Sequence, residues 1–117
     1  MEATGKLYDL SMVETISGGD KGFIVKMVQL FIETMPQNLK DLQNALTEQT
    51  WEMVGKHAHK MKSTIDSMGI VALKEDIRTV ESSGKHKTDL DAVPALVDRI
   101  ASILDQCIVQ LKRDFSL

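Results

Sequence analysis

Between residues 51 and 69 the chain reads WEMVGKHAHKMKSTIDSMG, and its apolar side chains recur three and four residues apart. This spacing places them on one face of an α-helix, in a narrow stripe typical of a helix packed between other helices. The stripe consists of Trp51, Val54, Ala58, Met61, Ile65 and Met68. Gly69 follows it, where a glycine commonly ends a helix. We therefore predict a helix with one buried face.

Two further helices are predicted before this segment. Residues 7–16 hold apolar side chains at helical spacing and precede two glycines, which indicates a short leading helix. Asp20 can cap the longer helix that follows. Pro36 lies inside that helix, and a proline removes one helical hydrogen bond. We therefore expect a kink or a break around Thr34 and Met35.

Two more helices are predicted after Gly69. Residues 70–80 form an amphipathic pattern that gives way to polar residues 82–87, which we interpret as a loop. Thr88 followed by Asp91 resembles a capping pair. It would begin a last helix that runs nearly to the C-terminus.

These helices account for most of the 117 residues, of which 43% are hydrophobic and 26% charged. This length fits one compact core, and the sequence has no strand-like alternation and no internal repeat. Four amphipathic helices with short connections form an antiparallel bundle. The sequence therefore predicts an all-α fold, an antiparallel four-helix bundle with a short additional N-terminal helix, in a single domain over residues 1–117.

Charge and cysteine content restrict the classes of partner and the setting. The formal net charge of −3 gives no global electrostatic support for binding nucleic acid or an anionic membrane. The single cysteine, Cys107, cannot form an internal disulfide, and neither a leader sequence nor a long apolar run occurs. We therefore expect a cytoplasmic monomer that contacts neither nucleic acid nor membrane.

His59 is the polar residue that a purely structural helix would not need. It points roughly 130° away from the centre of the apolar stripe, so we expect it in solvent, with Gly55, Lys62, Ser63 and Asp66 on its side. A neutral imidazole is a nucleophile near pH 7, and the ammonium of Lys62 can offset the charge of a phosphoryl group. Gly55 and Ser63 are small and leave room for a partner protein. The sequence predicts a docking face of Gly55, Ser63 and Asp66 around His59.

The run from Ala58 to Ser63, followed by Gly69, resembles the signature of the histidine phosphotransfer domain family. That signature has an alanine, the histidine, any residue, an aliphatic residue, a lysine and a glycine, with a second glycine ten positions after the histidine. The resemblance implies that His59 carries the phosphoryl group on Nε2 and that Lys62 lies beside it. It further implies that Glu81, on the next helix, accepts a hydrogen bond from Nδ1. Ser63 stands where the family has its first glycine, which puts the choice of partner in doubt.

By the same resemblance, the chain accepts a phosphoryl group from a receiver aspartate and donates it to another receiver. Its partners would be response-regulator receiver domains, a hybrid histidine kinase, or both. No cofactor or metal of its own is expected, and Mg²⁺ would belong to the partner receiver only. ATP-binding motifs are absent, so we expect a carrier without autokinase activity. We expect the docking patch on exposed apolar residues of the first two helices, namely Leu10, Met12, Phe31, Ile32 and Met35.

Several alternatives stay open from the sequence. His59 could be an incidental surface histidine, and Glu81 could simply pair with a surface lysine. His57 lies on the opposite flank of the helix, and a His-x-His spacing is poor for binding a metal. The chain could also be a helical adaptor that is never phosphorylated. Finally, it could be the phosphoacceptor domain of a larger chemotaxis-type histidine kinase, an alternative that Glu81 rather than glutamine keeps open. Met1 and the long last helix favour a self-contained unit.

Overall fold

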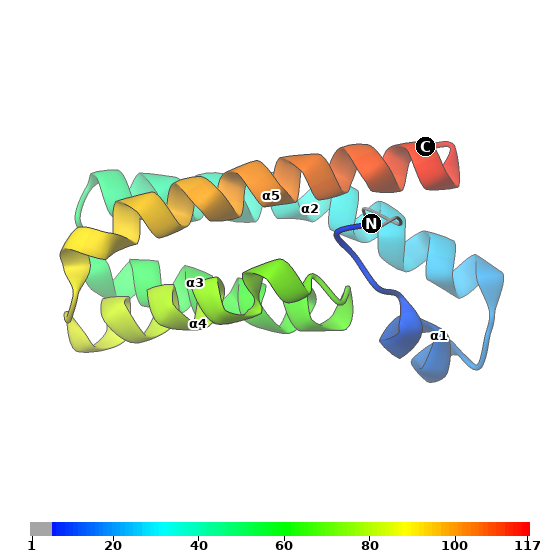
Figure 1. The fold of residues 1–117 in the computed structure, drawn as a ribbon, viewed down its shortest axis with the longest axis horizontal. Coiled ribbons are helices and arrows are strands. Elements are labelled where there is room, and N and C mark those ends of the chain that lie inside the picture. The colour runs from blue at the N-terminus through cyan, green and yellow to red at the C-terminus, as the bar shows by residue number, and fades with distance from the viewer. Residues whose placement is uncertain (1–5) are drawn as a thin grey trace.

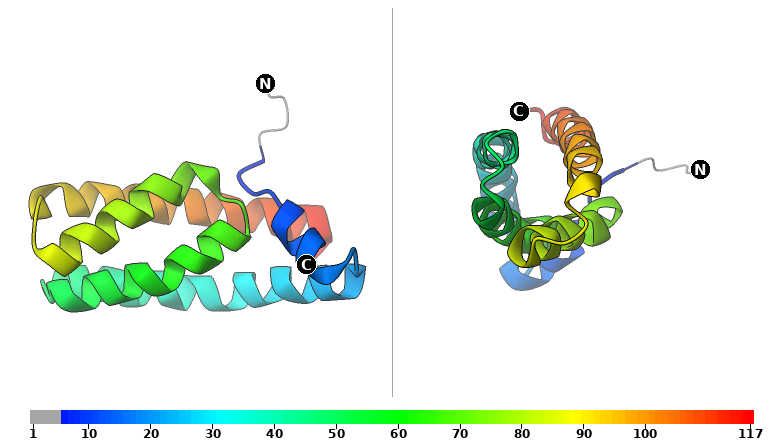
Figure 2. Two further views of the ribbon diagram at one scale, coloured as in Figure 1. Left: turned by 90° about the horizontal axis from the view of Figure 1, so that it is seen from below. Right: turned by 90° about the vertical axis from the view of Figure 1, so that its left-hand side faces the viewer.

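A computed structural model describes residues 6–117, and in this part of the chain the regular structure is entirely helical. In order, the elements are α1 (Ser11–Ser17), α2 (Lys21–Thr47), α3 (Trp51–Ser67), α4 (Val71–His86), the short 3₁₀ helix η1 (Leu90–Ala92) and α5 (Val93–Phe115). The four long helices run side by side along the molecule, and α1 lies at the end at which α5 finishes (Figure 1). Seen along the bundle, they surround a common centre (Figure 2). The predicted all-α bundle with a short additional N-terminal helix is confirmed.

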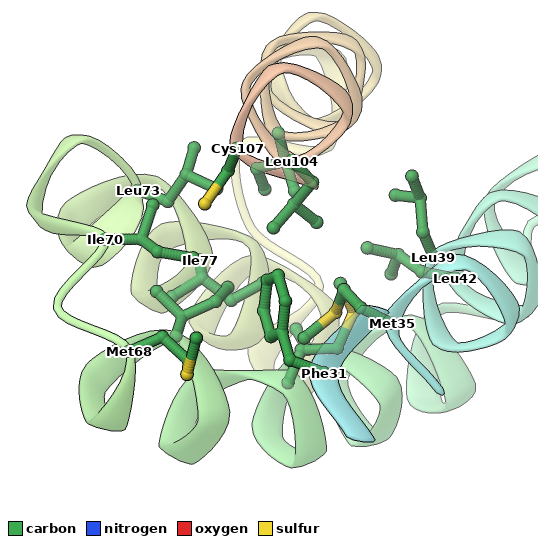
Figure 3. Packing of buried hydrophobic residues seen from close by; sticks show 14 of the residues in the cluster. Phe31, Met35, Leu39, Leu42, Met68, Ile70, Leu73, Ile77, Leu104 and Cys107 are labelled. Atoms are coloured by element: carbon green, nitrogen blue, oxygen red, sulfur yellow. The ribbon is translucent and has the colours of Figure 1, made fainter. Parts of the chain in front are cut away.

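The core consists of one apolar stripe from each long helix. In α3 the predicted stripe is buried from Val54 to Met68, and Trp51 at its start is half-buried. The stripes of α2, α4 and α5 meet it at the centre, as the cluster around Phe31, Ile77 and Leu104 shows (Figure 3). Burial of these side chains supplies most of the driving force for folding. No helix in the described part is long and apolar enough to cross a membrane.

The start of α2 is determined by a local cap, whereas its middle is held together by packing in the core. Asp20 caps the helix as predicted, because its carboxylate accepts hydrogen bonds from the backbone N–H groups of Gly22 and Phe23. Of the kink or break expected around Thr34 and Met35, the break is wrong, since α2 continues through Pro36. Met35 and Leu39, on either side of the proline, are buried in the core. Their packing holds the helix together across the missing hydrogen bond.

The second half of the chain differs from the prediction at one connection. Residues 82–86, interpreted as loop, form the last turn and a half of α4. Ser83 and Gly84 are buried there, so contact with α3 maintains a helix that the local composition disfavours. The capping pair of Thr88 and Asp91 is also wrong, because α5 begins without a side-chain cap and has a proline in its first turn.

The docking patch expected on the first two helices is wrong in three of its five residues. Leu10, Phe31 and Met35 are buried in the core, because their positions face the bundle centre. Met12 is 49% exposed, and Ile32 is half-buried. Only the last two are accessible to a partner.

Candidate functional site

His59 lies on the outer surface of α3. Its side chain is 70% exposed, and the apolar stripe of the same helix faces the opposite way, into the core. The prediction of a solvent-facing histidine is therefore confirmed. An exposed imidazole on a rigid helix can be reached by another protein while its orientation is still controlled.

Glu81 of α4 contacts both His59 and Lys62. One carboxylate oxygen, Oε2, lies 2.5 Å from Nδ1 of His59, and the other, Oε1, accepts a hydrogen bond of 2.8 Å from Nζ of Lys62. The side chains of Glu81 and Lys62 are 20% and 27% exposed, so this part of the site is much drier than the histidine ring. The structure thus brings together the three residues to which the sequence assigned chemistry.

The charge state of Glu81 follows from these contacts. The hydrogen bond from Lys62 holds the pKa of the Glu81 carboxyl below its usual value; partial burial opposes this effect, and the hydrogen bond with His59 adds to it. An ionised carboxylate can only accept hydrogen bonds, so Nδ1 of His59 must carry a proton. In the neutral ring Nε2 then has a free lone pair. Because the two ring nitrogens point in different directions, Nε2 is turned away from Glu81.

A contact between two glycines explains why α3 and α4 come this close. A Cβ atom added to Gly84 would lie 2.6 Å from the backbone nitrogen of Gly55 and 2.8 Å from the carbonyl oxygen of Trp51. The backbones of the two helices therefore touch, which a side chain at Gly84 would prevent. Gly55, predicted as part of a docking face, is buried at this crossing. Its role in packing was not predicted from the sequence.

The other two predicted docking residues lie further along α3. The carboxylate of Asp66 accepts two hydrogen bonds, of 2.6 and 3.0 Å, from the guanidinium of Arg78 on α4. This pairing lowers the pKa of Asp66 and ties the helices together one turn beyond Lys62. Ser63 is exposed, and its hydroxyl makes only a long hydrogen bond of 3.5 Å to the carbonyl of Lys60. Their contribution to docking stays a prediction.

A cavity of about 650 Å³ opens beside His59 between α3 and the end of α4. Three lysines and two glutamates contribute to its walls, and the glycine contact lies in it; its lining is Glu52, Gly55, Lys56, His59, Glu81, Gly84, Lys85 and Lys87. Lys85 and Lys87 were missed as site residues because the sequence placed them in a solvated loop. Had the helix been predicted to continue, the spacing of four residues would have placed Lys85 on the same helix face as Glu81.

His57 and Lys60 stand apart from this arrangement. His57 is half-buried and Lys60 is exposed, and neither lines the cavity. The absence of His57 from the cavity that His59 lines agrees with its predicted place on the opposite flank of the helix. Both residues therefore provide matched controls for the residues of the site.

Comparison with known proteins identifies one match. A protein-family model described as the Hpt domain matches residues 26–113, which include α3, α4 and the whole of the site. No curated protein and no solved structure matches the chain.

Proposed function

This chain belongs to the Hpt domain family, whose members transfer phosphoryl groups in phosphorelays, and we propose that its carrier atom is Nε2 of His59. The phosphoryl group comes from the aspartate of a receiver domain and passes to a second receiver. Lys62 and Glu81 support the transfer, and the chain itself needs no cofactor. It acts as a carrier and does not phosphorylate itself.

The contact of His59 with Glu81 is the observation that carries this proposal. The carboxylate lies 2.5 Å from Nδ1 and is held ionised by Lys62, so the ring keeps its proton on Nδ1 and offers Nε2 as nucleophile. The 70% exposure of the imidazole leaves this atom accessible to another protein's active site. A merely incidental surface histidine needs neither feature.

The positions of His59 and Glu81 determine the bond changes of the transfer step. The lone pair of Nε2 attacks the phosphorus of the aspartyl phosphate in line, an N–P bond forms, and the P–O bond breaks with its electron pair leaving on the aspartate carboxylate. The proton stays on Nδ1, and the negative charge of Glu81 offsets the positive charge that develops on the ring. Mg²⁺ bound by the receiver, and not by residues of this chain, would offset the charge of the phosphoryl oxygens. Donation to the second receiver reverses these bond changes.

The accessible apolar residues of α1 and α2 suit the receiver's contact surface. Met12 is 49% exposed and Leu30 is 52% exposed, and Ile32 is half-buried. Leu30 also lines a small groove together with Ser63, one helical turn from His59. Because this groove places Leu30 beside a residue one turn from His59, a receiver that reaches the histidine can also contact Leu30.

Phosphoryl transfer from labelled receivers tests the proposal. Wild-type protein should acquire an acid-labile label from at least one phosphorylated receiver domain, His59→Gln should acquire none, and Lys62→Ala should be labelled more slowly. His57→Gln is the matched control, because this histidine lies on the same helix outside the cavity, and it should behave as the wild type does. If neither a phosphorylated receiver nor a kinase domain with ATP labels the folded wild-type protein, the carrier function fails and the adaptor function takes its place.

Glu81 also favours a second candidate, in which the same histidine is the phosphoacceptor of a chemotaxis-type histidine kinase. The two candidates differ in the donor. A separate kinase domain with ATP would label His59 directly in the second case, and a phosphorylated receiver would do so in the first. Comparing the two initial rates on the same preparation decides between them.

A further inference from the structure

The cavity beside His59 is lined by three lysines to which the proposed function assigns no role. Its charged walls are Glu52, Lys56, Glu81, Lys85 and Lys87, with His59 at one side. Glu81 is already neutralised by Lys62, which does not line the cavity. The three lysines are then opposed by one further carboxylate, that of Glu52, so the cavity has an excess of positive charge and favours an anion.

Lys62 is poorly placed to be the principal partner of a phosphoryl group in this structure. Its ammonium is bound to Glu81 at 2.8 Å, on the side of the ring where Nδ1 lies. Nε2 points away from Glu81, so a phosphoryl group on that atom is carried away from this ion pair. Another cation has to balance its charge.

Lys85 and Lys56 are both available for this. Lys85 lies one helical turn after Glu81, and its backbone nitrogen would be 3.1 Å from a Cβ atom on Gly55, so the glycine contact brings it next to α3. In the described part of the chain it forms no ion pair. Lys56 lies one turn before His59, and its pair with Glu52 is long, at 3.5 Å, between side chains that are 65% and 79% exposed. Such an exposed pair is weak and easily exchanged.

We infer that the phosphoryl group on His59 is held in this cavity by Lys85 of α4 and Lys56 of α3. The inference rests on the proposed function, because it requires His59 to carry that group. The ligand is a phosphoryl dianion, and one ammonium group approaches it from each helix. Lys62 in turn keeps Glu81 in place behind the ring.

Titration of the phosphorylated protein by ³¹P NMR tests this. The whole chain is phosphorylated with phosphoramidate, whose P–N bond breaks with loss of ammonia as the N–P bond to imidazole forms, and His59→Gln assigns the signal. A nearby ammonium stabilises the dianion, so Lys85→Gln and Lys56→Gln should each raise the titration midpoint, with proton binding about 1.5- to 5-fold tighter. Lys60→Gln removes an ammonium next to His59 in sequence but outside the cavity, and its midpoint should remain that of the wild type.

Each outcome of this experiment decides one question. If either Lys85→Gln or Lys56→Gln titrates as Lys60→Gln does, the assignment of these two lysines is wrong while the carrier function stands. If the signal survives in His59→Gln and no receiver labels the protein, both the carrier function and this inference fail. Circular dichroism of the exposed-lysine variants establishes that the helices are intact.

Discussion

At the scale of single residues, the site depends on a carboxylate that binds two partners at once. Glu81 accepts from Lys62 with one oxygen and contacts Nδ1 of His59 with the other. Its side chain is mostly buried, so losing either partner would leave a charge poorly solvated. The orientation of the nucleophile and the local stability of the α3–α4 contact thus depend on the same group.

Two substitutions of Glu81 should distinguish its role as a hydrogen-bond acceptor from its role as a negative charge. Glu81→Ala removes the acceptor for Nδ1, so the ring loses its fixed tautomer, and we expect phosphoryl transfer from a receiver to slow by about tenfold or more. Glu81→Gln keeps an oxygen acceptor and should transfer faster than Glu81→Ala. Single-turnover transfer rates measure both. Equal rates for wild type and Glu81→Ala would show that Glu81 does not orient the ring.

The stability of the protein at low pH should also depend on Glu81. Its pKa in the folded protein lies below the ordinary value of 4.5, so its ionisation stabilises the fold above that pH. The contribution is lost as the pH falls through the lowered pKa. The difference in free energy of unfolding between wild type and Glu81→Gln should therefore be constant above about pH 5.5 and shrink below about pH 4.5. Urea unfolding across this range measures it, and a difference independent of pH would contradict the assignment.

At the scale of helices, the contact of Gly84 with Gly55 determines where the site residues of α3 and α4 lie relative to one another. A methyl group on Gly84 would meet backbone atoms at 2.6 and 2.8 Å, which cannot move without displacing a helix. Local packing here therefore controls the distance from Glu81 to His59. It also places Lys85 at the cavity.

Gly84→Ala should destabilise the protein although alanine is the better helix former. Forcing the helices apart typically costs about 1–3 kcal/mol in free energy of unfolding, more than the gain in helix propensity of roughly 1 kcal/mol. The imidazole resonances of His59 should shift as Glu81 withdraws. Ser82→Ala is the control, because Ser82 is exposed on the same turn of α4. Denaturant unfolding measures the free energy of unfolding of both variants. Equal values for Gly84→Ala and Ser82→Ala would show that the contact of Gly84 with Gly55 does not limit how closely the helices approach.

The same contact shows where prediction from the sequence succeeds and where it stops. The stripe of α3, its end at Gly69 and the cap at Asp20 follow from local spacing and chemistry, and all were predicted. The last turn of α4 was not, because polar residues and Gly84 resemble a loop unless the facing Gly55 is known. His59 and Lys62 share a helix, so their proximity follows from spacing. Because Glu81 lies on another helix, only the resemblance to a family predicted its contact with His59.

At the scale of the whole molecule, the segment before α1 joins the two ends of the described chain. The hydroxyl of Tyr8 donates a hydrogen bond of 2.5 Å to Asp114 near the end of α5, and the N–H of Asp9 donates to the carbonyl of Met68 after α3. Gly69 makes the second contact possible, because a Cβ atom there would lie 2.3 Å from the carbonyl oxygen of Asp9. This segment therefore closes the end of the bundle away from the cavity.

The Tyr8 contact should make the fold sensitive to alkali. Burial raises the pKa of the Tyr8 phenol well above its ordinary value of 10.0, and the hydrogen bond to Asp114 raises it further. A group whose pKa is raised by folding stabilises the protein below its unfolded value, so this stabilisation is complete below about pH 9 and is lost as the pH rises beyond 10. Wild type should therefore lose stability above pH 10 more steeply than Tyr8→Phe. The chain has one tyrosine, so its absorbance titrates this phenol alone, and a midpoint near 10 in the folded protein would mean that Tyr8 is not held against α5.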